Sequence, residues 1–72
     1  MSEARKFFVL GGGSMGKRRI RCLQAHGVKP KHIRVFDQRE DRRLECRSRY
    51  EVEGVTSFED GMAWDPQVAI NS

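Results

Sequence analysis

The clearest candidate for a binding site in this chain is a glycine-rich segment that is followed, at a distance, by one acid. The apolar run 7–10 leads directly into six residues with the spacing Gly-x-Gly-x-x-Gly. These residues are Gly11, Gly12, Gly13, Ser14, Met15 and Gly16. Asp37 lies 21 residues after the last of these glycines, at the end of a second strand-like run, residues 33–36. A strand, a glycine turn, a helix and an acid in this order form the pattern that binds a dinucleotide.

Each glycine of the motif has a physical task in that interpretation. Gly11 permits a tight turn out of the strand, and Gly13 lets the backbone approach a pyrophosphate. Gly16 allows the helix to pack close to the strand, and the N-terminus of that helix offers N–H groups and a positive dipole end to phosphates. The alternative is a merely flexible turn. A P-loop is not supported, because it needs Ser or Thr where Arg18 follows Lys17.

Asp37 predicts a preference between the two nicotinamide cofactors. A carboxylate at the end of the second strand can accept both hydroxyls of the adenosine ribose and repels a 2′-phosphate, so NAD is favoured over NADP. Arg39, Arg42 and Arg43 keep NADP open, since an arginine near this point can hold a 2′-phosphate. Asp37 could instead only cap the following helix. The expected cofactor-binding residues are Gly11, Gly12, Gly13, Ser14, Met15, Gly16, Asp37, Gln38, Arg42, Asn71 and Ser72.

The segments that would position these residues alternate between strands and helices. The helix after the glycines is expected to stop at Gly27, and Pro30 favours an extended approach to the next strand. A short third helix has Ser57 as its N-cap and ends before Pro66. The expected order is strand 7–10, helix 14–26, strand 33–36, helix 39–50, strand 52–55, the short helix and strand 68–71.

This order predicts an α/β protein with a partial Rossmann (doubly wound) fold. Right-handed crossovers then give a parallel sheet of four strands in the order 3-2-1-4, with three helices. Met15, Ile20 and Leu23 are expected on the inner face of the first helix. Leu44 and Tyr50 are the expected apolar anchors of the second helix, which is otherwise dense in charge.

The cysteines and histidines do not predict a metal site. Cys22 and Cys46 lack a C-x-x-C spacing, and His26 and His32 do not complete a zinc pattern with them. Free, half-buried thiols in a reducing cytosol are the expectation.

Length and charge narrow the classes of protein to consider. A complete dinucleotide-binding fold needs roughly twice the 72 residues of this chain, so residues 1–72 are interpreted as the N-terminal portion of such a domain in a longer enzyme. The net charge of +4 would suit a polyanion, but acids and bases are interleaved after Asp37, so no nucleic-acid partner is expected. The sequence has no signal core and no apolar stretch of ~20 residues, so no membrane partner and a cytoplasmic location are expected.

The sequence also resembles a known family. The residues from Gly11 to Arg19 are similar to the opening of the Gfo/Idh/MocA oxidoreductases, the glucose–fructose oxidoreductase and inositol dehydrogenase group. The resemblance covers about residues 6–72 and departs at Arg19, where the family often has His. Further similar segments follow in the same order, namely Val35-Phe36-Asp37 with Arg39, Tyr50, Val55 to Asp60, and Asp65-Pro66.

The resemblance implies hydride transfer between a nicotinamide and a sugar, polyol or related hydroxyl-bearing substrate, performed by a longer protein. The family's Glu-Lys-Pro motif, which supplies the catalytic lysine, would lie beyond Ser72. The resemblance therefore implies no catalytic residue in this chain and no turnover by it alone. A small-molecule substrate would meet only the longer protein.

Other classes of function stay open on the sequence. A nucleotide-sensing module could have the same fold without chemistry. A methyltransferase fragment would bind S-adenosylmethionine at a similar glycine loop, although a ligand without a pyrophosphate has less need of Gly16. A polyanion-binding role is the weakest alternative. Because a fourth strand with an exposed edge invites association, a homo-oligomer is a further hypothesis.

Overall fold

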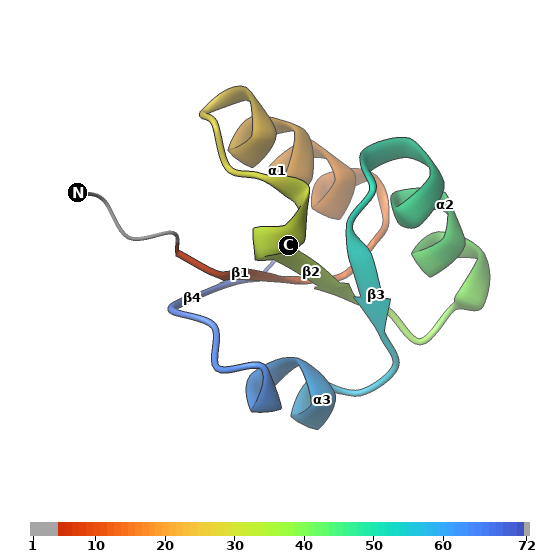
Figure 1. The fold of residues 1–72 in the computed structure, drawn as a ribbon. Helices are drawn as coiled ribbons and strands as arrows, with labels where there is room; N and C mark the ends of the chain where they lie inside the picture. The colour runs from red at the N-terminus through yellow and green to blue at the C-terminus, as the bar shows by residue number, and fades with distance from the viewer. Residues whose placement is uncertain (1–4, 72) are drawn as a thin grey trace.

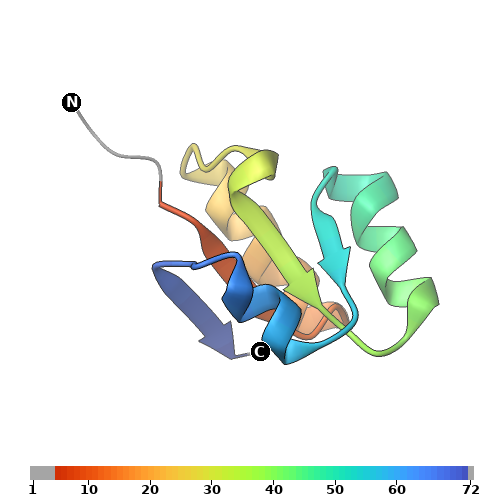
Figure 2. The ribbon, with the colours of Figure 1, turned by 60° about the horizontal axis from the view of Figure 1, so that its bottom comes forward.

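The computed structural model describes residues 5–71, which form one sheet with helices on both faces (Figure 1). The strands are β1 (Phe7–Leu10), β2 (Ile33–Phe36), β3 (Glu53–Val55) and β4 (Val68–Asn71), and the helices are α1 (Ser14–Ala25), α2 (Glu40–Tyr50) and α3 (Phe58–Ala63). All strand pairs are parallel, and the order across the sheet is β3-β2-β1-β4 (Figure 2). Helices α1 and α2 lie on one face and α3 lies on the other (Figure 1). The predicted fold class and strand order are confirmed.

The predicted element boundaries are nearly right, since α1, α2 and β3 each lack one terminal residue of the expected range. The extended approach expected at Pro30 is wrong, because one 3-10 turn, η1 (Pro30–His32), leads into β2. The fixed φ of proline suits the first position of such a turn.

Helix α1 ends because Gly27 has a φ of +92°. Its N–H donates to the carbonyl of Gln24, and the N–H of Val28 reaches the carbonyl of Leu23 at 3.0 Å. A glycine with positive φ after a helix lets the N–H groups that follow bond back to the last helix carbonyls, as this pair of bonds does. In residues 5–71 no helix combines the length and apolar character needed to cross a bilayer.

Strand β1 is apolar throughout because both of its faces are covered. Phe8 and Val9 are fully buried and point to opposite faces of the sheet, as successive strand residues must. Val9 belongs to the core under α1 and α2, whereas Phe8 lies beneath α3. The core cluster consists of Val9, Ile20, Ile33, Val35, Cys46 and Val52.

Several side chains differ from the expected burial. Leu44 is not an anchor of α2, since it is 59% exposed. The buried residue of α2 is Cys46. Because residues two positions apart lie on nearly opposite sides of a helix, the burial of Cys46 leaves Leu44 exposed. Met15 is also exposed rather than on the inner face of α1. Five residues separate it from the buried Ile20, which is more than one helical turn, so the two side chains lie on different faces. The two thiols are not half-buried, since Cys22 is exposed and Cys46 is buried.

Helix α3 packs on β1 through a glycine. A Cβ at Gly61 would overlap the ring of Phe8, so only glycine allows the helix to lie this close to the strand. Phe58 of the same helix meets Phe8 with ring centroids 6.0 Å apart. Ser57 caps the helix as predicted, with its Oγ accepting from the N–H of Asp60 at 3.0 Å.

Trp64 is half-buried, and two cations lie near its ring. The Nζ of Lys6 lies 5.3 Å from the ring centroid, and the guanidinium of Arg34 lies 4.5 Å from it. The backbone N–H of Lys6 also donates to the side-chain Oε1 of Gln67, and the N–H of Gln67, just before β4, donates to the carbonyl of Lys6. These contacts join the amino ends of β1, β2 and β4 and leave the carboxyl ends of the strands for the glycine loop.

Candidate functional site

The glycine loop leaves β1 at the carboxyl edge of the sheet and is tied there to β2. The N–H of Gly11 donates to the carbonyl of Phe36 at 2.7 Å. Gly11 has a φ of +106°, which a residue with a Cβ adopts only under strain. The turn that the sequence assigns to Gly11 is therefore present in the backbone.

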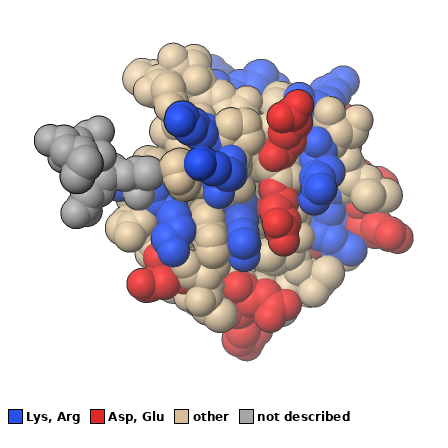
Figure 3. Space-filling view, viewed as in Figure 1, with Lys and Arg blue, Asp and Glu red and all other residues tan. Residues whose placement is uncertain are grey.

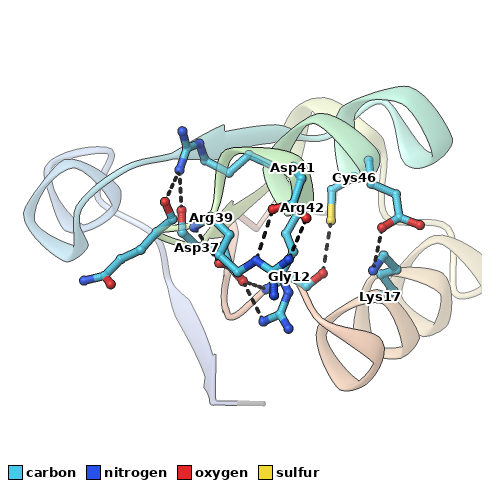
Figure 4. A network of polar contacts seen from close by, with 10 residues as sticks. Gly12, Lys17, Asp37, Arg39, Asp41, Arg42 and Cys46 are labelled. Atoms are coloured by element: carbon cyan, nitrogen blue, oxygen red, sulfur yellow. Dashed lines mark hydrogen bonds and ion pairs between the residues drawn. The ribbon is translucent and has the colours of Figure 1, made fainter.

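Asp37 joins the glycine loop to the loop after β2 (Figure 4). Its Oδ2 accepts from the N–H of Gly12 at 2.8 Å, and its Oδ1 accepts from the N–H of Arg39 at 2.9 Å. The side chain is almost entirely buried. Burial raises the pKa of this carboxyl, but the N–H bonds from Arg39 and Gly12 and the charge of Arg42 outweigh it, so the pKa lies below its ordinary value. Asp37 is therefore an anion at neutral pH.

Two of the three neighbouring arginines are occupied by contacts within the loop. Arg39 forms a fork with Asp41, from Nε to Oδ1 at 3.1 Å and from Nη2 to Oδ2 at 2.8 Å. Arg43 donates from Nη1 to the carbonyls of Asp37 and Gln38 at 2.7 and 3.0 Å. These contacts hold the loop between β2 and α2 in shape.

Arg42 differs from both because it reaches over the glycine loop. Its Nη1 lies 3.6 Å from the Oδ2 of Asp37, and a Cβ built on Gly13 would lie 3.4 Å from the same nitrogen. The side chain is 40% exposed. The guanidinium is thus placed between the acid and the segment that the sequence assigns to a pyrophosphate.

Two hollows follow this edge of the sheet and meet at Gly11 and Arg42. One, of about 420 Å³, is lined by Leu10, Gly11, Phe36, Asp37, Gln38, Arg39 and Arg42. The other, of about 290 Å³, is lined by Gly11, Gly13, Ser14, Met15, Gly16 and Arg42. Because they share these two residues, the hollows lie next to each other between the acid and the N-terminus of α1, and together they are called the cleft. Ligands of open α/β sheets bind outside the carboxyl ends of the strands, where this cleft lies.

The N-terminus of α1 opens into the second hollow. No side chain caps this helix, whose N-cap is Gly13. The uncapped first turn offers backbone donors and the positive end of the helix dipole to an anion. Lys17, by contrast, is turned away from the loop, because its Nζ pairs with Glu45 of α2 at 2.9 Å (Figure 4). Lys17, which stands at the position of a P-loop lysine, is therefore paired with Glu45 rather than directed at the glycine loop.

Cys46 is a residue of this region that the sequence did not reveal. Its Sγ lies 3.9 Å from the carbonyl of Gly12 and is fully buried beneath the loop (Figure 4). Burial raises the pKa of this thiol, which keeps it protonated. The only signal in the sequence is its spacing of four residues from Arg42, which places both on one face of α2.

Of the remaining expected residues, Gln38 and Asn71 lie at the carboxyl edge of the sheet. Gln38 lines the first hollow and is exposed. Asn71 is paired in register with Leu10, at the end of β4, and so stands at the same sheet edge. Ser72 lies outside the described residues. Within residues 5–71 no group of His, Cys, Asp or Glu side chains could hold a metal ion.

Another hollow, of about 550 Å³, lies at the opposite edge of the sheet. Its lining includes Lys31, Arg34 and Arg47 together with Glu51 and Glu53, near the starts of β2 and β3. The face shown in Figure 3 likewise has basic side chains interrupted by acidic ones. The face shown in Figure 3 therefore carries charges of both signs.

The arrangement has a counterpart among solved structures. A pyrroline-5-carboxylate reductase (proC) from Coxiella burnetii is similar to this chain, with a TM-score of 0.84 and 21% sequence identity. The fold is Rossmann-like. The match covers 97% of this chain and 26% of that reductase, so the chain spans about a quarter of its length. No protein-family model and no curated protein matches the chain.

Proposed function

We propose that residues 1–72 form the first part of an NAD(P)-binding domain in a longer oxidoreductase. The observation that carries this proposal is the contact between Asp37 and the backbone of Gly12 at the carboxyl ends of adjacent strands. It brings a ribose acceptor and a phosphate loop into one cleft, at the separation along the chain that dinucleotide-binding proteins use.

The residues present suit the adenosine and pyrophosphate portions of such a cofactor. A carboxylate offers about four acceptor positions, and Asp37 uses two of them for backbone N–H groups. The others are available for ribose hydroxyls. The uncapped start of α1, next to Gly13, would receive the pyrophosphate. Gln38, Arg42 and Asn71 border the same path.

The nicotinamide, when bound, would carry the hydride, and the residues that act on the substrate would belong to the rest of the longer protein. The resemblance to Gfo/Idh/MocA enzymes supports a sugar, polyol or related hydroxyl-bearing small molecule as that substrate. The structural neighbour is named as a reductase, which supports oxidoreductase chemistry in general. A cytoplasmic location and a homo-oligomer are parts of the same proposal. Strand β4 pairs with β1 within the described residues and lies at an edge of the sheet, where association would occur.

Calorimetric titration of the chain with NAD⁺, ADP-ribose and S-adenosylmethionine tests the proposal. NAD⁺ and ADP-ribose should bind with similar affinity, because the cleft contacts only the portion that the two share. S-Adenosylmethionine, which lacks the pyrophosphate, should bind much more weakly. Binding of S-adenosylmethionine alone would replace the proposal with the methyltransferase alternative.

A further inference from the structure

Three arginines follow Asp37, and the structure assigns them different surroundings. Arg39 is held by Asp41, and Arg43 is held by two backbone carbonyls. Arg39 also lines the hollow beside Asp37, whereas Arg42 lines both hollows and has its Nη1 3.6 Å from the Oδ2 of Asp37. The sequence leaves open which of them could meet a phosphate on the adenosine ribose, and these contacts single out Arg42.

We infer that Arg42 enables this site to accept a dinucleotide whose adenosine ribose bears a 2′-phosphate, in addition to one without it. The inference rests on the proposed function. The nitrogen of Arg42 is 3.6 Å from the carboxylate of Asp37, too far for a good hydrogen bond. A guanidinium has five N–H donors, so Arg42 keeps donors for a second anion while it remains beside Asp37.

The obstacle to a 2′-phosphate is the negative charge of Asp37, and the structure compensates that charge. Two backbone N–H groups bond to its oxygens, and Arg42 adds a full positive charge nearby. An incoming phosphate would therefore meet an ion pair rather than a bare carboxylate. Among the acids of the first turn of α2, Asp41 is paired with Arg39, and Glu40 is exposed. Exposed charges are largely screened by solvent.

Arg42 also has the freedom to follow a ligand. Its guanidinium end is partly exposed, whereas its Cβ would lie 3.5 Å from a Cβ on Gly12. The stem is therefore held against the loop while the charged end can move within the cleft. Both hollows include this side chain in their lining, so the ribose and the pyrophosphate are within its range.

The test compares NAD⁺ and NADP⁺ binding by calorimetry for the parent chain, R42Q and R49Q. R49Q removes the same charge from the same helix, at an exposed side chain that pairs with Glu45 and lines neither hollow. The parent should bind the two nucleotides with affinities within about tenfold of each other. R42Q should weaken NADP⁺ binding by about tenfold or more and NAD⁺ binding by less than about threefold. R49Q should leave the ratio of the two affinities unchanged.

Two outcomes would overturn the inference while leaving the proposed function intact. One is a parent chain that binds NAD⁺ and rejects NADP⁺. The other is an R42Q variant in which both affinities fall equally. Binding of neither nucleotide by a folded parent chain would overturn the proposed function and the inference with it. If R42Q loses its dispersed amide spectrum, R42M, which keeps an apolar stem against Gly12, makes the same comparison.

Discussion

The carboxylate of Asp37 accepts a hydrogen bond of 2.8 Å from the backbone of Gly12, 25 positions earlier in the chain. This contact fixes the acid relative to the glycine loop. It also links stability to binding, because the carboxylate that holds the glycine loop is also the group proposed to accept the ribose hydroxyls.

Replacement of Asp37 by Asn is expected to lower both the stability of the chain and its affinity for a dinucleotide. The amide of Asn cannot accept two N–H bonds as an anion does, and one side of it presents a donor to the backbone donors of Gly12 or Arg39. We expect a loss of about 1–3 kcal/mol in the free energy of unfolding, measured by urea denaturation. Asp41→Asn is the matched control, since Asp41 is an exposed acid of the same segment. Equal stability of both variants would contradict the role given to Asp37.

The lowered pKa of Asp37 predicts a particular dependence of stability on pH. The unfolded chain binds a proton to this carboxyl near its ordinary pKa of about 3.9, whereas the folded chain does so only at lower pH. The contribution is therefore fully present well above about pH 4 and is lost as the pH falls through the lowered value. Urea midpoints measured between about pH 6 and pH 2.5 should fall more steeply for the parent chain than for Asp37→Asn. Parallel curves would show that the pKa of Asp37 is not lowered.

Two alanine substitutions in the glycine loop should separate folding from binding. Gly11→Ala places a side chain at a φ of +106° and should cost about 1–3 kcal/mol of stability. Gly13 has an ordinary φ of −76°, and its new Cβ would touch only the movable end of Arg42. Gly13→Ala should therefore fold with near-parental stability yet bind a dinucleotide more weakly. Urea denaturation and calorimetry measure the two effects, and undiminished binding by Gly13→Ala would count against a pyrophosphate at this point.

Gly61→Ala should destabilise the chain although alanine is the better helix former by about 1 kcal/mol. The new Cβ would overlap the ring of Phe8, and a packed core does not absorb such a volume without strain of about 1–3 kcal/mol. A smaller residue at position 8 should relieve the strain, so Phe8→Leu combined with Gly61→Ala should be less destabilising than the sum of the two single changes. Additive losses in a double-mutant cycle would exclude this contact as the cause.

The topology could be predicted because it depends on local patterns that are strong in this chain. The apolar run 7–10, the glycines after it and the caps at Gly27 and Ser57 each specify a short segment with little help from the rest. Once the segments alternate as strand and helix, the crossover rule leaves few arrangements of the sheet.

The side-chain arrangement of α2 could not be predicted in the same way. Its sequence has many charges and no clear apolar stripe, so the burial of Cys46 and the exposure of Leu44 depend on the rotation of the helix about its axis. The different surroundings of Arg39, Arg42 and Arg43 follow from that rotation. Gly61 was similarly ambiguous, because a glycine that weakens a helix and one that permits close packing look alike in a sequence.

The glycine loop and Asp37 are proposed to bind a dinucleotide together. An amide-resolved NMR titration of the chain with NAD⁺, and then with NADP⁺, would locate that binding, residue by residue. We expect saturable shifts at the amides from Gly11 to Gly16 and at Asp37, with much smaller shifts near Lys31 and Glu53 at the opposite sheet edge. A well-dispersed spectrum that neither nucleotide changes would contradict this proposal.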